Sequence, residues 1–287
     1  MTRPPLLSTR QSPSGRDTRG IPRPEIGNVS YEGVDITGCT IPGKVALTFD
    51  DGPYIYTNEL LDLLESNNVK ATFFLTGNND LAGQRGPGPF GGNFDVLKRM
   101  HANGHQLGSH TWSHKDLTAT SPEETEEEII WNEMAFVEAL GFFPTYFRPP
   151  YTSCGWDCAH AIARWGYHMV SDIEIFHPTL FKKPLADGDT RKADYNIDTK
   201  DYLGDYDYAR SVFSESLKEG NPKSDSFISL SHDIWPDTVH TLVQFMINTT
   251  RSEGYQLVTL GECVGDPVEN WYRNPDNGGP MTIEKAG

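Results

Sequence analysis

The amino-acid sequence predicts an α/β fold with a parallel sheet or an α/β barrel. Short apolar stretches typical of buried strands alternate with segments of helical periodicity between residues 45 and 260, and this alternation is the pattern of parallel α/β folds. In addition, acidic, basic and histidine side chains follow directly after several of the expected strands. Because function sits at the carboxyl ends of strands in such folds, we expect these side chains to meet at one edge of the sheet.

The individual elements follow from local patterns. Strands are predicted where apolar, β-branched or aromatic residues cluster between turn residues, at 45–49, 69–75, 105–108, 146–147, 167–170, 227–231 and 256–260. Helical periodicity predicts helices at 58–66, 94–103, 121–140, 157–165, 208–217 and 238–252. Thr57 is a candidate cap for the first helix. The third begins with Ser121, Pro122 and Glu124, which form a capping box with proline in the first turn.

The composition is that of a globular protein and argues against nucleic acid as a partner. The chain of 287 residues, 22% charged and 37% hydrophobic, is long enough for one large α/β domain or two small ones. Its formal net charge of −16 opposes binding to phosphate backbones, which requires a basic face. No apolar run approaches the ~20 residues that a membrane-spanning helix needs.

The four cysteines favour disulfide bonds. Cys154 and Cys158 are close enough to close a small loop, and a bridge between Cys39 and Cys263 would join the ends of the region with folded character. An even number at this spacing favours an oxidising compartment, with four buried free thiols as the alternative. The spacing does not suit a four-cysteine zinc site.

The two ends of the chain are predicted to lie outside the folded region. Residues 1–40 are expected to form a disordered or extended tail, and residues 266–287 a second tail, around a domain at 41–265. Residues 1–24 are rich in Arg, Pro, Ser and Thr and lack the apolar core of a signal peptide. They are therefore interpreted as a disordered tail or as the start of a truncated chain.

The segment Thr48-Phe49-Asp50-Asp51-Gly52-Pro53 is the first candidate for a functional site. Two adjacent carboxylates stand at the end of an apolar strand, and Gly-Pro breaks the chain directly after them. A buried pair of like charges is costly unless a cation or a proton lies between them. One carboxylate is therefore expected to hold a metal and the other to handle a proton; the alternative is an ordinary solvated turn.

Further candidates follow later strands. His110 and His114 have the four-residue spacing of paired metal ligands, although such a pair also arises by chance. One carboxylate and two histidines would leave a zinc-like ion an open position for water. Arg148 is suited to keep the second carboxylate ionised. His232 is suited to donate a proton to a leaving group.

These motifs, in this order, resemble those of the polysaccharide deacetylases, the NodB-homology domain of carbohydrate esterase family 4. The resemblance covers about residues 41–260 and rests on four segments: 48–53, Ser109-His110-x-x-x-His114, Arg148-Pro149-Pro150-Tyr151 and Leu230-Ser231-His232. Segments 76–79, 104–109 and 144–147 are similar to fungal chitin deacetylases within that family. The resemblance implies a distorted (β/α) barrel of the NodB type.

The resemblance also implies a role for each matching residue. The divalent metal, zinc or another ion such as Co²⁺, would be held by Asp51, His110 and His114. Asp50 would be the general base for the attacking water, with Arg148 orienting it. His232 would be the general acid for the departing amine. The backbone N–H of Tyr151 would stabilise the oxyanion, and Leu230 would line the slot for the acetyl methyl.

The cysteines also match the fungal pattern, which implies Cys39–Cys263 and Cys154–Cys158 bridges. The same match implies a secreted protein although the chain carries no signal peptide. We expect a monomer.

The family's fourth motif is interrupted here. It fits Asp198-Thr199-Lys200-Asp201-Tyr202, where Asp201 would tune His232 and Tyr202 would wall the acetyl slot. The motif normally continues directly from a strand, but residues 172–194 separate it from the strand at 167–170. We hypothesise that 172–194 is an insertion, either a true loop or an unspliced intron, which would misplace Asp201 if it broke the strand. The segment 172–174 is a poorer match to the motif.

The predicted function is hydrolysis of a linear amide C–N bond. The substrate would be the N-acetylglucosamine units of chitin or its oligosaccharides, and acetate would be released. Peptidoglycan or xylan is the alternative substrate, because the first and last motifs do not separate these deacetylases. A catalytically impaired chitin-binding homologue is the alternative of another class, favoured by the interrupted fourth motif. A metal-free structural protein would leave the strand-end residues as a coincidence.

Overall fold

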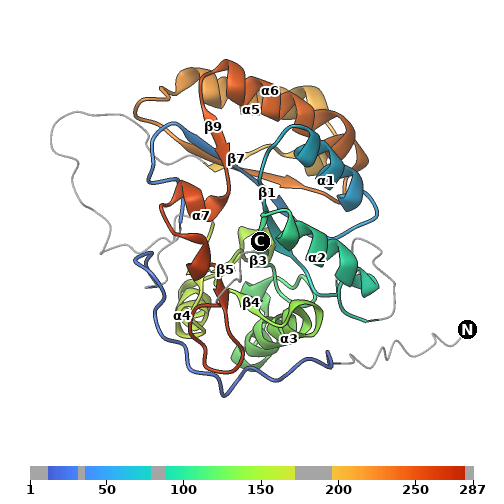
Figure 1. Cartoon of the computed structure of the whole chain (residues 1–287), viewed down its shortest axis with the longest axis vertical. Coiled ribbons are helices and arrows are strands. Elements are labelled where there is room, and N and C mark those ends of the chain that lie inside the picture. Colours follow the sequence, from blue (N-terminus) through green and yellow to red (C-terminus); the bar gives the residue numbers. More distant parts are fainter. Residues whose placement is uncertain (1–11, 32–35, 79–87, 172–195, 282–287) are drawn as a thin grey trace, which may run out of the picture.

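The structure, a computed structural model, describes residues 12–31, 36–78, 88–171 and 196–281. The predicted α/β fold is confirmed: seven parallel strands run in the order β6-β5-β3-β2-β1-β8-β7, and β9 also pairs with β1. The curled sheet is a distorted (β/α) barrel (Figure 1). Its strands are β1 (Lys44–Asp50), β2 (Thr72–Leu75), β3 (Gln106–Ser109), β5 (Tyr146–Phe147), β6 (His168–Met169), β7 (Asn196–Asp198), β8 (Phe227–His232) and β9 (Gln256–Val258).

Strand β1 is the centre of this sheet. Its residues from Val45 to Asp50 are all buried, because neighbouring strands and helices cover both of its faces. It pairs in parallel with β2, β8 and β9. The register places Asp50 opposite His232 on β8. The carboxyl ends of neighbouring strands therefore lie at the same edge of the barrel.

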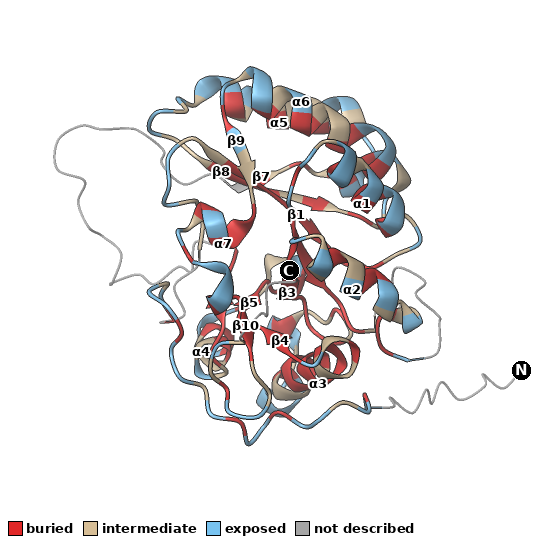
Figure 2. Ribbon diagram, in the orientation of Figure 1, coloured by how far each residue is buried: buried red, intermediate tan, exposed pale blue. Residues whose placement is uncertain are grey.

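Helices pack around the sheet and bury apolar faces against it (Figure 2). They are α1 (Thr57–Ser66), α2 (Phe94–Ala102), α3 (Pro122–Leu140), α4 (Trp156–Arg164), α5 (Tyr206–Glu219), α6 (Val243–Ser252) and the short α7 (Leu260–Cys263). The capping box predicted for α3 is present: Glu124 N–H donates to Ser121 Oγ, and the Glu124 carboxylate accepts from Ser121 N–H. Each satisfies one of the donors left free at a helix start.

Two local predictions differ from the structure. Thr57 is the first residue of α1 rather than its cap; its hydroxyl instead accepts from Tyr54 N–H and donates to Asp233. The last strand stops at Val258 instead of Leu260, because Thr259 caps α7 through a second capping box with Glu262. Helix α7 was not expected from the pattern, since four residues are too short to show a helical period.

The predicted tails are part of the folded body where the structure describes them. Residues 12–31 form no helix or strand, yet Thr18, Ile21 and Tyr31 are buried. Thr18 donates a hydrogen bond to Glu133 of α3, and Arg23 forms a buried ion pair with the same carboxylate. This segment runs beneath α3 and α4 at the bottom of the barrel (Figure 1). A segment without local periodicity can be ordered by long-range contacts alone. The prediction of a tail, which was based on composition, therefore missed these contacts.

The C-terminal segment is also packed. Strand β10 (Tyr272–Arg273) pairs antiparallel with β4 (Phe143–Pro144). Trp271 is buried, and its indole N–H donates to the carbonyl of Asp266. The fold thus extends beyond residue 265, where the sequence-based boundary was placed.

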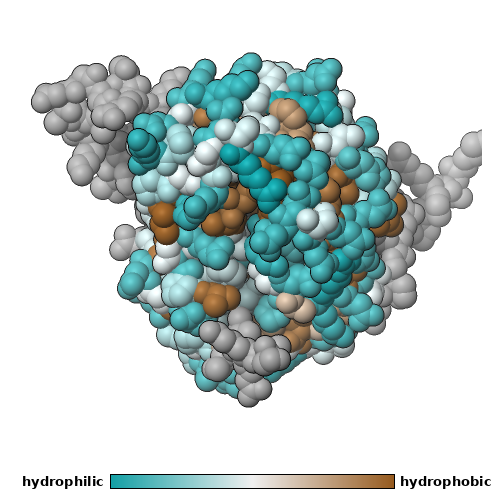
Figure 3. Space-filling model, turned by 45° about the horizontal axis from the view of Figure 1, so that its top comes forward, coloured by the Kyte–Doolittle hydropathy of each residue, from teal (hydrophilic) through white to brown (hydrophobic). Residues whose placement is uncertain are grey.

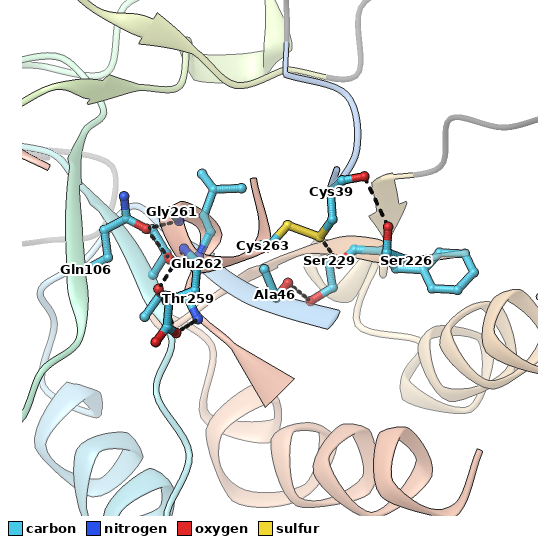
Figure 4. The surroundings of a disulfide bond; sticks show 12 residues. Cys39, Ala46, Gln106, Ser226, Ser229, Thr259, Gly261, Glu262 and Cys263 are labelled. Carbon is cyan, nitrogen blue, oxygen red and sulfur yellow. Dashed lines mark hydrogen bonds between the residues drawn. A yellow bond between two sulfur atoms is a disulfide. The ribbon is translucent and has the colours of Figure 1, made fainter. Parts of the chain in front are cut away.

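Both predicted disulfides are present, Cys39–Cys263 and Cys154–Cys158. The first joins the segment before β1 to α7 across 224 residues of sequence (Figure 4). Around it, Ser226 Oγ donates to the carbonyl of Cys39, and Gln106 accepts from Gly261 N–H. The bridge therefore ties the two ends of the barrel's sequence together.

The surface is mostly polar on the face shown in Figure 3, with apolar groups confined to a few places. Among the described residues, no helix is both long and apolar enough to cross a membrane. The suspected insertion at 172–194 lies outside the described residues.

Candidate active site

Side chains from five strand ends form the candidate site. Asp50 ends β1, and Asp51 follows it. His110 follows β3, and Arg148 follows β5. The other contributions come from His232, the last residue of β8, and from Asp201 in the 3₁₀ turn after β7. The convergence follows from the parallel sheet, whose strands all end at the same edge.

Asp51, His110 and His114 form a buried cluster with the donor set of a metal site. One ligand atom from each residue lies within 4.8 Å of the others. Asp51 Oδ1 is 2.9 Å from His114 Nε2 and 3.3 Å from His110 Nε2. One carboxylate oxygen and two imidazole nitrogens suit zinc and similar ions.

The tautomer of His110 supports a cation at this point. Its Nδ1 lies 2.7 Å from the carbonyl oxygen of Arg148. A carbonyl only accepts hydrogen bonds, so Nδ1 carries the proton, and in the neutral ring Nε2 presents a lone pair to Asp51. Two acceptors facing each other repel unless a cation lies between them, so these residues fit a divalent metal.

Three residues in and around the cluster have strained backbone conformations. Asp51, Thr111 and His114 have positive φ angles of 74°, 70° and 55°, a region that residues other than glycine adopt at a cost. His114 N–H donates to Thr111 Oγ1, which closes the turn between the two histidines. Burial raises the pKa of Asp51, but hydrogen bonds from His110 and His114 in their protonated forms lower it more, so in that state it lies well below its usual value.

Asp50 is held by Arg148. Its Oδ1 accepts a 2.8 Å hydrogen bond from Arg148 Nη1, and both side chains are buried. The guanidinium also donates to Thr48 Oγ1 and stacks 4.3 Å from the ring centroid of Phe74. These contacts fix the guanidinium in place, and the guanidinium in turn orients the Asp50 carboxylate.

His232 is hydrogen-bonded to Asp201, although 172–194 separates the motif of Asp201 from β6. His232 Nδ1 lies 2.7 Å from Asp201 Oδ1, and His232 N–H donates to Oδ2. Thr238 also donates to Oδ2. Burial lowers the pKa of His232, but the hydrogen bond to Asp201 and the charges of Asp201, Asp51 and Asp50 raise it to about 9.

The remaining predicted residues lie around these groups. The ring of Tyr202 packs edge-on against His232 with centroids 5.6 Å apart, and that of Tyr151 packs against His114 at 4.7 Å. Both tyrosines are exposed, and Leu230 on β8 is half-buried. Tyr151 has a positive φ of 57° within the turn Pro150–Thr152.

Known proteins are similar to this chain over most of its length. The polysaccharide deacetylase family model matches residues 37–170. The chain is 38% identical to a chitin deacetylase of Colletotrichum lindemuthianum, over 84% of this chain and 87% of the relative. It is 40% identical to a chitin deacetylase of a Pestalotiopsis species, over 84% of this chain and 70% of the relative.

The solved structure of the Colletotrichum lindemuthianum chitin deacetylase superposes with a TM-score of 0.72 at 36% identity, covering 91% of this chain and all of that one. The chain belongs to the polysaccharide deacetylases. It is therefore a hydrolase that acts on amide C–N bonds.

Several residues that contact the candidate site residues were not predicted from the sequence. Thr48 receives a hydrogen bond from Arg148 and donates to the carbonyl of Ser229, and Thr238 holds Asp201. A threonine in a strand or a helical turn has no distinctive pattern, so no local signal marks these two. Asp233 directly follows His232, and its place as an acidic residue at a strand end could have identified it, but it was not predicted.

Asp233 connects the loop after β1 to the end of β8 beside the candidate site. It is fully buried, and its Oδ2 accepts from Thr57 Oγ1 at 2.6 Å. Thr57 in turn accepts from Tyr54 N–H, so the loop after β1 is tied to the residue after His232. Burial raises the pKa of Asp233 to about 7. The carboxyl group also lies directly against Gly52.

We expect Gly52→Ala to destabilise the protein. A methyl group at Gly52 would lie 2.4 Å from both carboxyl oxygens of Asp233, so the loop or Asp233 must move. Overpacking of this kind costs about 1–3 kcal/mol. Urea unfolding measures the loss, with Gly38→Ala as the control, because a methyl there meets no atom within 4 Å. Equal stability of Gly52→Ala and wild type would contradict the contact.

Proposed function

We propose that the chain removes N-acetyl groups from N-acetylglucosamine units of chitin or its oligosaccharides and releases acetate. The arrangement of Asp50, Asp51, His110, His114 and His232 at one edge of the barrel is the observation that carries the proposal. The named relatives support chitin as the substrate, because both sequence relatives described above are chitin deacetylases.

The proposed metal is Zn²⁺ or another divalent ion, held by Asp51, His110 and His114. When bound, such an ion supplies polarisation of the acetyl carbonyl and a lower pKa for water. The convergence of one carboxylate oxygen and the two Nε2 atoms supports this ligand set.

The protein's own groups would move the protons. Water attacks the carbonyl carbon of the acetamide, and Asp50, oriented by Arg148, takes the proton that water loses. As the C–N bond breaks, His232 gives a proton to the amine nitrogen. Acetate and a free amine result. Tyr151 would stabilise the oxyanion through its backbone N–H, and Leu230 with Tyr202 would line the space for the acetyl methyl.

The hydrogen bond between His232 and Asp201 supports an active enzyme rather than an impaired chitin-binding homologue, since misplacement of Asp201 was the reason to expect impairment. We further propose that the protein is secreted. Its two disulfides support an oxidising compartment.

The decisive experiment is acetate release from N-acetylglucosamine oligomers by the purified chain, after chelation and with zinc restored. Peptidoglycan fragments and acetylated xylan are assayed in parallel. Zinc-dependent release from the chitin oligomers supports the proposal. Release from peptidoglycan or xylan alone would replace the substrate, and no release from any of them with zinc bound would overturn the function.

The pH dependence offers a separate prediction for Asp201. His232 has a pKa raised to about 9, so it stays protonated at neutral pH and loses its proton as the pH rises through that value. Asp201→Asn removes the largest interaction that raises this pKa, so the alkaline limb of kcat/KM is expected to move to lower pH. An alkaline limb unchanged in Asp201→Asn would contradict the assignment of His232 as the acid.

A further inference from the structure

Helix α3 turns an unusual polar surface toward the two histidines of the proposed metal site. Thr125, Glu128 and Asn132 lie on one side of this helix at spacings of three and four residues, and all three are buried. Two of them contact the segment that carries His110 and His114. A buried charged residue in a helix is costly, so its contacts indicate what it holds in place.

Glu128 contacts the turn between the two histidines at Ser113. Its Oε2 accepts the backbone N–H of Ser113 and its Oε1 accepts the Ser113 hydroxyl, both at 2.6 Å. The backbone carbonyl of Glu128 also accepts from Trp112 N–H at 2.8 Å. Glu128 is fully buried, and Ser113 directly precedes His114.

Asn132, one helical turn further along, holds the other end of the same segment. Its side-chain NH₂ donates to Ser109 Oγ at 2.8 Å and to the carbonyl of Leu75 at 3.0 Å. Ser109 directly precedes His110. One face of α3 therefore contacts the residue before each of the two histidines.

The turn needs such external support. Thr111 and His114 both have positive φ angles, so the segment does not adopt this shape by its own preference. Short hydrogen bonds to a charged, buried acceptor are stronger than those between neutral groups. They are well suited to hold a strained turn in the one shape that aims both imidazoles at Asp51.

We propose that Glu128 is a positioning residue that sets the geometry of the zinc ligands by holding Ser113. This inference rests on the proposed metal site. The contacts of Glu128 with Ser113 reach the ligands through the backbone that joins them. Groups that orient metal ligands in this way typically change metal affinity about 10- to 100-fold when they are replaced.

The test is zinc affinity, measured by competition with a chromophoric chelator, for wild type, Glu128→Gln and Ser113→Ala. Glutamine keeps the size of Glu128 but replaces its charged carboxylate with a neutral amide, so both hydrogen bonds to Ser113 lose their charge assistance and zinc binding is expected to weaken about 10- to 100-fold. Ser113→Ala removes one of the two hydrogen bonds and is expected to weaken zinc binding less. Glu127→Gln is the matched control, since it makes the same charge change at the neighbouring, half-buried position of α3.

Thermal unfolding of the metal-free proteins separates positioning from mere stability, with affinities measured where every variant is folded. Weaker zinc binding by folded Glu128→Gln and Ser113→Ala, but not by Glu127→Gln, supports the inference. Wild-type affinity in Glu128→Gln would overturn it, even with a lower melting temperature. If Glu128→Gln does not fold, unchanged affinity in Ser113→Ala overturns it. A wild-type protein that binds no zinc would instead overturn the proposed metal site.

Discussion

Replacement of Asp50 by asparagine is expected to lower kcat for deacetylation by a factor on the order of 10²–10⁴ while zinc remains bound. Asparagine has nearly the shape of aspartate but does not accept a proton from water. Arg148 would keep an oxygen to donate to at the same place, and Asp51, His110 and His114 are unchanged. Acetate release gives kcat, and elemental analysis gives the zinc content of the same sample.

The control for this loss is Asp95→Asn, which removes the same charge from an almost fully exposed side chain on α2. It should leave both zinc content and kcat at their wild-type values. Asp50→Asn with kcat close to that of the wild type would remove Asp50 as the base. Loss of zinc from Asp50→Asn would assign Asp50 to metal binding instead.

Replacement of His110 by alanine is expected to remove metal and activity together. The change deletes one of the three ligand atoms and the hydrogen bond that links the imidazole to the carbonyl of Arg148. Two remaining ligands hold zinc much more weakly than three, because binding depends on ligand number and geometry. Dialysed protein should then contain no stoichiometric zinc and release no measurable acetate.

His240→Ala is the matched control, because His240 lies on the surface and contacts Glu59 rather than the site. It should keep zinc and activity. Full zinc occupancy in dialysed His110→Ala would contradict the ligand set. Together with Asp50→Asn, this variant separates the two proposed roles: one loses turnover alone, and the other loses turnover with metal.

Much of the fold and of the candidate site could be predicted from the sequence. The alternation of apolar strands and periodic helices predicted a parallel sheet or an α/β barrel, because strand and helix periods are local properties that a few residues display. Asp50, His110 and Arg148 were expected to converge for a simple reason: parallel strands end at one edge of their sheet. The capping box at Ser121 is equally local, since its two partners are three residues apart.

The surroundings of those residues could not be predicted, because they depend on contacts between segments that are far apart in the sequence. Residues 12–31 were predicted as a tail, but Thr18 and Arg23 reach Glu133, more than a hundred residues away. Glu128 stands in an acidic run with no local mark of burial, yet it is fully buried and its carboxylate accepts two hydrogen bonds from Ser113. No local sequence pattern indicates that Glu133 pairs with the N-terminal segment or that Ser113 pairs with Glu128. Burial of a charge is decided by the free energy of its contacts, and these contacts exist only once distant segments of the chain have packed together.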